Sequence, residues 1–150
     1  MSIRARIEDA MFLWKHGRVD GAFLNALVAV AATARRRYPK ATYPSDRAAF
    51  EQFLTDAHTV RISVEYRGEQ QAVEHILYKW LRCQLLHEGE LPPDIKFMPD
   101  VDPNWMLVRA GGPPEYVLKM SYGWFDHLVA SVLQARENKD LFADVTEAGA

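Results

Sequence analysis

Apolar residues recur at helical spacing through the first quarter of the chain. The first set steps by four, four and three residues and comprises Ile3, Ile7, Met11 and Trp14. This spacing places them on one face of a helix that ends near Gly17. A second helix is predicted after Asp20, a favourable N-cap residue, and its many alanines indicate close packing against neighbouring helices. The run Arg35–Arg37 favours its carboxyl end, and Pro39 prevents it from continuing.

The middle of the chain predicts two further helices separated by an extended segment. Ser45 or Asp46 can cap a third helix that reaches Ala57. Residues 59–66 alternate weakly between apolar and polar, which fits either a short strand or an extended connection. After a turn at 67–69, a fourth helix is predicted from Gln70 to about His87, where Gly89 stops it. Its apolar residues recur at steps of four and comprise Val73, Leu77, Leu81 and Leu85.

The pattern changes between residues 91 and 120, where prolines become frequent. Residues 105–109 and 115–120 flank a loop at 110–114, which is typical of a β-hairpin. A last helix is predicted over 121–139. These elements form a single domain over residues 1–142, and residues 143–150 are predicted to be a disordered tail. We therefore predict an all-α fold, an up-and-down helical bundle of about five helices with a small β-hairpin inserted before the last helix.

Composition narrows the classes of function. Hydrophobic residues make up 49% of the 150 residues, charged residues 25%, and the net charge is −2. This excludes a general basic coat and hence tight non-specific duplex binding. One cysteine permits no intrachain disulfide, which fits a reducing cytosol. The early charges at the N-terminus do not fit a signal peptide, and the longest apolar stretch, 22–34, is too short to span a bilayer. We expect a cytoplasmic protein with no membrane association.

The most informative chemistry lies at the end of the fourth predicted helix. Arg82 and His87 are five residues apart there. An arginine is a permanent forked cation suited to phosphate, and a histidine can exchange a proton near neutral pH. On an ideal helix, five residues turn about 140° beyond one full turn, so the two side chains do not meet within one helix. A shared site is easier if the last turn unwinds at 86–89, and easier still if two protomers pair about a two-fold axis. A homodimer is therefore expected if the pair is catalytic.

The segment Arg82-Cys-Gln-Leu-Leu-His87 resembles the Arg-x4-His signature of HEPN-domain ribonucleases. Leu77–Leu81 before it, Glu88-Gly89 after it, and the earlier apolar helix at 22–32 are also similar, and the likeness extends over roughly residues 8–135. The resemblance implies a dimeric RNA endonuclease that needs no metal or other cofactor. It also implies a place in a toxin–antitoxin or defence system, with an antitoxin protein as a partner.

In the cleavage that the resemblance implies, the 2′-hydroxyl of the RNA attacks its own phosphate and leaves a cyclic phosphate. His87 would act as general base or acid, and Arg82 would stabilise charge on the phosphate oxygens. The family usually has a polar residue, often asparagine, where this chain has Cys83. The alternative function is therefore a catalytically inactive dimer that binds protein or RNA. A third is a helical domain that binds a small molecule beneath the hairpin.

Three neighbours could support the pair, each with a simpler structural role beside it. Tyr78 could steady Arg82 or stack a base, although core packing is the more frequent role of a tyrosine. Glu88 could hydrogen-bond the imidazole or remain a solvated carboxylate. Cys83 and His87 have a spacing that metals use, but a closed zinc site needs four ligands, so no metal is predicted. The cluster at Arg35–Arg37 could follow phosphates, although cations at a helix end are stabilising in themselves.

Overall fold

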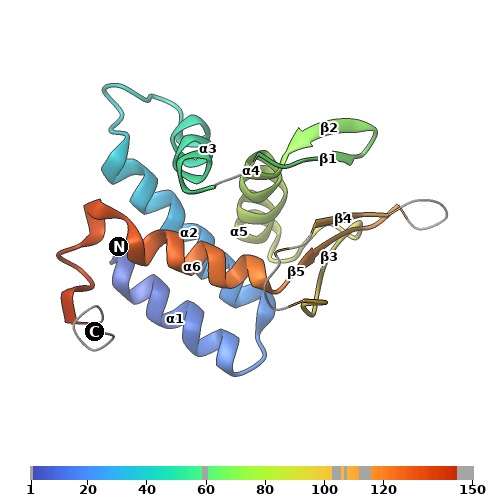
Figure 1. The fold of residues 1–150 in the computed structure, drawn as a ribbon, viewed down its shortest axis with the longest axis horizontal. Helices are drawn as coiled ribbons and strands as arrows, with labels where there is room; N and C mark the ends of the chain where they lie inside the picture. Colours follow the sequence, from blue (N-terminus) through green and yellow to red (C-terminus); the bar gives the residue numbers. More distant parts are fainter. Residues whose placement is uncertain (1, 59–60, 103–105, 107, 112–115, 145–150) are drawn as a thin grey trace.

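The computed structural model describes residues 2–58, 61–102, 106, 108–111 and 116–144. Its helices form one part of the molecule, and its strands gather at the opposite end, to the right in Figure 1. The prediction of an all-α bundle is wrong, because two small β-sheets accompany the helices and make the fold mixed α and β. The predicted disorder of the tail stays a prediction, since residues 145–150 lie outside the described residues.

The first three helices follow the predicted pattern closely. They are α1 (Ile3–Lys15), α2 (Val19–Arg37) and α3 (Asp46–Ala57). The Ser45 side chain caps α3 by accepting a hydrogen bond from the Ala48 backbone N–H at 3.2 Å. The prediction of Asp20 as an N-cap is wrong, because α2 begins one residue earlier and Asp20 lies in its first turn. There its charge favours the positive end of the helix dipole.

The fourth helix is continuous over residues 73–88 but changes its winding. It consists of α4 (Val73–His75), the π-helical η1 (Ile76–Cys83) and α5 (Gln84–Glu88). We call it the 73–88 helix. In η1 each N–H bonds the carbonyl five residues earlier. This winding is rare in proteins, and where it occurs it is often found at functional sites. Gly89, with a φ of 77°, ends the helix in the left-handed conformation that glycine adopts without strain.

The last helices are shorter than predicted. The α-helix α6 spans Gly123–Gln134, and a 3-10 turn, η2, follows at Arg136–Asn138. The predicted start at Ser121 is wrong because Ser121 ends a strand. The first turn of α6 is held from outside, since the Gly123 N–H donates to the Asp100 carboxylate at 2.7 Å.

The first sheet is a two-stranded hairpin where a strand or an extended connection was expected. Strands β1 (Ser63–Tyr66) and β2 (Glu69–Ala72) pair antiparallel, with Tyr66 opposite Glu69. Both turn residues, Arg67 and Gly68, have positive φ, as a type I′ turn requires. The prediction that the fourth helix starts at Gln70 is therefore wrong, because β2 occupies those residues.

The second sheet contains the predicted hairpin and one strand more. Strands β4 (Val108–Ala110) and β5 (Leu118–Ser121) pair antiparallel, which confirms the hairpin. Parts of its predicted arms and loop, residues 105, 107 and 112–115, lie outside the described residues. Strand β3 (Ile95–Met98) pairs parallel with β5, giving the order β3-β5-β4. Proline-rich flanks obscured β3 in the sequence, and its partner strand is distant along the chain.

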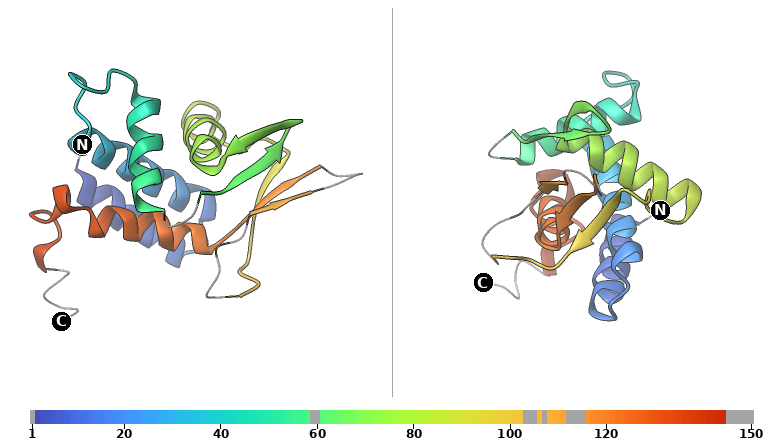
Figure 2. Two further views of the ribbon diagram at one scale, coloured as in Figure 1. Left: turned by 45° about the horizontal axis from the view of Figure 1, so that its top comes forward. Right: turned by 90° about the vertical axis from the view of Figure 1, so that its right-hand side faces the viewer.

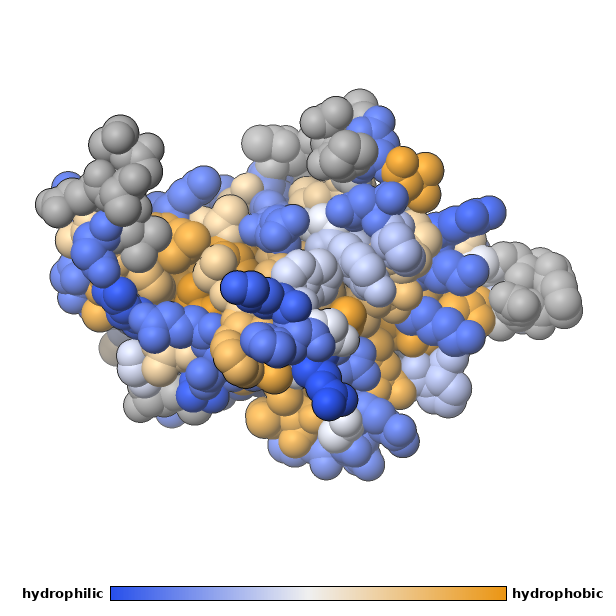
Figure 3. Space-filling model, turned by 90° about the horizontal axis from the view of Figure 1, so that it is seen from below, coloured by the Kyte–Doolittle hydropathy of each residue, from blue (hydrophilic) through white to orange (hydrophobic). Residues whose placement is uncertain are grey.

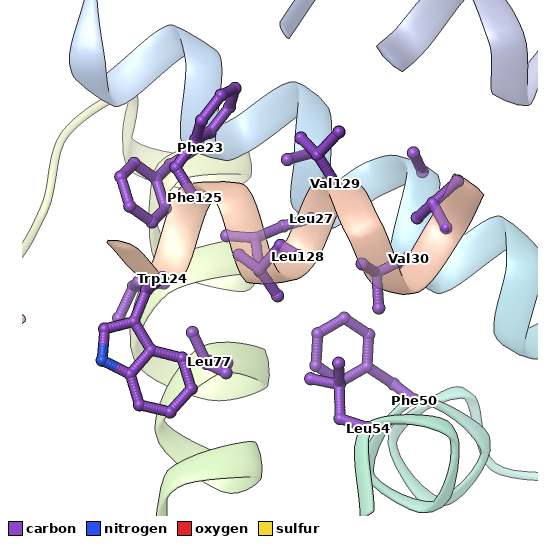
Figure 4. Packing of buried hydrophobic residues seen from close by; sticks show 14 of the residues in the cluster. Phe23, Leu27, Val30, Phe50, Leu54, Leu77, Trp124, Phe125, Leu128 and Val129 are labelled. Atoms are coloured by element: carbon purple, nitrogen blue, oxygen red, sulfur yellow. The ribbon is translucent and has the colours of Figure 1, made fainter. Parts of the chain in front are cut away.

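Helix α2 lies against α1, α3 and α6 (Figure 2), and a single hydrophobic core joins these helices. Figure 4 shows apolar side chains of α2, α3, α6 and the 73–88 helix meeting in this core. The alanines of α2 at 22, 26 and 29 are fully buried, which confirms close packing between helices. Phe23 of α2 stacks on Phe97 of β3 with ring centroids 3.9 Å apart, so the core extends to the second sheet.

Candidate functional site

Arg82 lies at the border of the core on the 73–88 helix. Its guanidinium carbon is 5.3 Å from the centroid of the Tyr78 ring, and its Nη1 donates weakly to the Cys83 sulfur at 3.9 Å. Its Nε–H is buried and has no hydrogen-bond partner among the described residues. Tyr78 therefore holds the arginine, and its ring also packs on Phe50 of α3 at 5.2 Å. The two roles predicted for Tyr78, core packing and support of Arg82, occur together.

The structure does not bring His87 to Arg82 within one chain. His87 and Glu88 are exposed in the last turn of α5, which stays helical up to Gly89. The unwinding considered for 86–89 is therefore absent. No hydrogen bond joins Glu88 to His87 in the part of the chain that the structure describes. Leu86 beside them is 50% exposed, an apolar side chain at the tip of the helix.

The surroundings of Arg82 are positively charged. Asp46, at the start of α3, accepts a hydrogen bond from Arg35 Nε at 2.7 Å. That bond lowers the pKa of Asp46, and the charges of Lys40 and Arg82 lower it further. Three cations therefore surround one carboxylate, and the local excess of positive charge suits an anion.

The three arginines at the end of α2 are occupied by carboxylates. Arg35 pairs with Asp46, and the other two tie α2 to the chain's end. Arg36 pairs with Asp140 at 3.5 Å, and Arg37 pairs with Glu137 at 2.9 Å. The cluster therefore acts as a structural clamp whose cations are paired, while its predicted effect on the helix dipole stays a prediction.

Sequence reasoning gave His58, His75 and His127 no role, yet two of them have carboxylate partners. His58 Nδ1 lies 2.6 Å from the Glu74 carboxylate in a buried pair. The His127 ring is 4.9 Å from the His58 ring, and neither Nε2 atom has a hydrogen-bond partner among the described residues. The pKa of His127 is lowered to about 4, mainly by burial of the ring and secondly by the charge of His58. These contacts join α3, α4 and α6.

His75 belongs to a more open site. Its Nδ1 lies 2.9 Å from the Glu51 carboxylate of α3, and Arg47 bonds the same carboxylate at 3.3 Å. These residues border a cleft of about 450 Å³ between α3 and the hairpin β1–β2. The partners in both histidine pairs lie 16 and 24 residues apart in sequence, so local spacing carries no signal of them.

A second cavity of about 560 Å³ lies between the turn of β1–β2 and the strands β4 and β5. Asp94 accepts hydrogen bonds there from the Tyr66 hydroxyl at 2.6 Å and from Arg67 Nε at 2.8 Å. The hydrogen bond from Arg67 is the main cause that lowers the pKa of Asp94, and the hydrogen bond from Tyr66 lowers it further. In this cavity Arg67 forms an ion pair with Asp94, which neutralises the positive charge of the arginine.

The molecular surface is mixed in polarity, and the described residues contain neither a metal-binding group nor a membrane-spanning helix. Seen from below, the molecule shows apolar patches separated by polar side chains (Figure 3). In the described parts of the chain, no three His, Cys, Asp or Glu residues are grouped so as to hold a metal ion. None of the described helices combines the length and apolar character needed to cross a membrane.

Comparison with known sequences places the chain in a family. A sequence model of the family described as Rv1289 matches residues 2–68 and 59–145, and so covers most of the chain. The chain belongs to the Rv1289 family. No curated protein and no solved structure matches this Rv1289-family protein.

Proposed function

We propose that this protein binds RNA and cleaves it without a metal, through Arg82 and His87 supplied by two protomers. The observation that carries the proposal is the state of Arg82. Its guanidinium is held by Tyr78 and keeps a buried Nε–H without a hydrogen-bond partner among the described residues. A guanidinium forms charge-assisted hydrogen bonds with phosphate oxygens, and a small movement of Arg82 that opens its Nε–H to such an oxygen would relieve the cost of this unpaired buried donor.

The exposed His87 supplies the proton chemistry that this reaction needs. Cleavage by the 2′-hydroxyl requires a base for that hydroxyl and an acid for the leaving oxygen. Arg82 stabilises the charge that develops on the phosphate oxygens. The Arg-x4-His spacing, which resembles the signature of HEPN ribonucleases, supports this division of roles.

A dimer is part of the proposal because one chain keeps the two groups apart. His87 and the exposed Leu86 lie at the tip of the 73–88 helix. Two such tips related by a two-fold axis bring each His87 towards the Arg82 of the other protomer. Leu86 supplies apolar surface at the contact.

A second candidate is an RNA-binding module without cleavage activity. Cys83 occupies the position after Arg82, and its sulfur already contacts the guanidinium at 3.9 Å. A thiol is a weak hydrogen-bond group, so it orients substrate poorly. Under this candidate, Arg82 still binds phosphate while turnover is absent.

The experiment compares purified wild type with Arg82→Ala and His87→Ala on labelled RNA in EDTA. We expect wild type to leave 2′,3′-cyclic phosphate ends. We expect His87→Ala to lose about 10²–10⁴-fold in rate with RNA affinity retained, and Arg82→Ala to lose affinity as well. The control is Arg18→Ala, which changes an exposed arginine at the start of α2. RNA binding without cleavage by wild type favours the second candidate, and neither binding nor cleavage refutes both.

A further inference from the structure

The 73–88 helix turns one side towards α3, and two functional groups share that side. His75 bonds Glu51 of α3, and the charge of Arg82 acts on Asp46 at the start of α3. The two residues are seven positions apart, and η1 between them is π-helical, so their common side is set by these contacts with α3 and not by α-helical spacing. His75, and not His87, is therefore the histidine on the Arg82 side within one chain.

The aromatic residue between them in the sequence also packs against α3. Tyr78 lies between His75 and Arg82, packs on Phe50 of α3, and carries the guanidinium of Arg82 over its ring. An aromatic ring between a cation and an imidazole offers a platform on which a ribose or a base can rest. Contacts with α3 thus follow one another along the 73–88 helix from Arg82, through Tyr78, to His75, which borders the cleft.

His75 is held in a defined state within that cleft. Glu51 lies 2.9 Å from Nδ1, so in the neutral ring Nδ1 carries the hydrogen and donates it. The lone pair is then on Nε2, as a general base requires. The side chains of His75 and Glu51 are 19% and 24% exposed, so the pair is packed yet reachable from solvent.

Charge and size favour a nucleoside in this cleft and its phosphate beside Arg82. At the Arg82 end, the positive charges of Lys40 and Arg82 act on the single carboxylate of Asp46, which already pairs with Arg35, so positive charge is in excess there. At the cleft, Glu51 neutralises Arg47, and Glu69 adds a carboxylate, which disfavours a phosphate. The cleft volume of about 450 Å³ lies in the range of roughly 300–1,000 Å³ typical of small-ligand pockets.

We propose that His75, held by Glu51, is a second proton-transfer residue of the RNA cleavage site, an inference that rests on the proposed function. His75 Nε2 takes the proton of the ribose 2′-hydroxyl as the O2′–P bond forms. The P–O5′ bond breaks, and the leaving O5′ takes a proton from His87 of the second protomer. Arg82 holds the phosphate throughout, and water later restores both imidazoles to their starting states.

The test measures single-turnover RNA cleavage in EDTA from pH 5 to 9 for wild type, His75→Gln and Glu51→Gln. We expect His75→Gln to lower the rate about 10²–10⁴-fold and to abolish the rising limb of the pH profile, with RNA affinity unchanged. We expect Glu51→Gln to shift that limb and to lower the cleavage rate about tenfold. His16→Gln, at the exposed histidine that follows α1, keeps the wild-type profile.

Rescue separates a chemical role from a structural one. Imidazole added to His75→Gly is expected to restore cleavage in proportion to its concentration, and His75→Asn provides a second variant should glycine disturb the helix. Wild-type rates and profiles in the His75 variants would overturn this inference and leave the proposed function intact. No cleavage by wild type, or undiminished cleavage by Arg82→Ala, would overturn both.

Discussion

At the scale of single residues, two neighbouring histidines show how the surroundings of a side chain set its protonation. The Nδ1 of His58 has a carboxylate partner at 2.6 Å, whereas neither the Nε2 of His58 nor that of His127 beside it has a hydrogen-bond partner among the described residues. For Glu74, burial is the largest single influence and raises the pKa, but the hydrogen bonds from His58 and the backbone, together with nearby positive charge, leave the pKa lowered. His58 and Glu74 therefore form a stable pair, and His127 is the residue that acid disturbs.

This difference predicts a pH dependence of stability. The folded pKa of His127 is about 4, below its ordinary value of 6.5, so the unfolded chain binds the proton more readily. The part of the folding stability that depends on a neutral His127 ring is complete above pH 6.5 and is lost as the pH falls from 6.5 towards 4. We expect a loss of about 1–2 kcal/mol, reduced from the full shift because the ring is partly exposed.

Urea unfolding of wild type and His127→Gln at pH 7.5 and pH 4.5 checks this prediction. The variant should lose less stability between the two pH values than wild type. Equal losses would show that another group controls the acid sensitivity. His16→Gln serves as the control, since this exposed histidine hydrogen-bonds only a backbone carbonyl of its own helix among the described contacts.

At the scale of elements, local signals predicted the helices, and non-local pairing decided the rest. The caps and apolar spacing of α1 and α3 involve residues within one or two turns, so the sequence alone reveals them. The pairing of β3 with β5 joins Ile95 to Leu118, and the bond of Glu51 to His75 spans 24 residues. Neither leaves a periodic trace, which is why the mixed fold and the His75 cleft were not predicted.

The candidate site itself was predicted only in part. The exposed end position of His87 and the border position of Arg82 follow from the helical pattern. The π-helical winding of η1 does not, because it depends on how the 73–88 helix packs on its neighbours. Dimer formation stays a prediction.

The end of the 73–88 helix depends on one glycine. Gly89 has a φ of 77°, where a side chain is strained even though space is open around it. We expect Gly89→Ala to cost about 1 kcal/mol and Gly89→Asn less, because asparagine tolerates this conformation. Thermal unfolding followed by circular dichroism measures both, with Glu90→Ala as an exposed control. A melting temperature unchanged in Gly89→Ala would contradict the left-handed helix end.

At the scale of the whole molecule, aromatic stacking links the helical part to the second sheet. Phe23 is fully buried and stacks on Phe97 of β3, while its edge meets Trp14 and Phe125. Because one core serves both parts, we expect them to unfold together.

Phe23→Ala tests this coupling. We expect it to lower the free energy of unfolding by about 3–5 kcal/mol, the usual cost of removing a buried phenylalanine. Far-ultraviolet circular dichroism and tryptophan fluorescence should give coincident urea transitions in wild type. Phe12→Ala, at a side chain that is 62% exposed, should change little. Two separate transitions in wild type would show that the sheet and the helices are independent.

The lone thiol of this chain also has a practical consequence. Cys83 is partly exposed, and its sulfur lies 3.9 Å from the Arg82 guanidinium. A maleimide dye or spin label therefore attaches at a single, known position, with no background from other sulfhydryls. In the predicted dimer, the distance between the labels on the two Cys83 residues would show in solution how the two molecules are oriented.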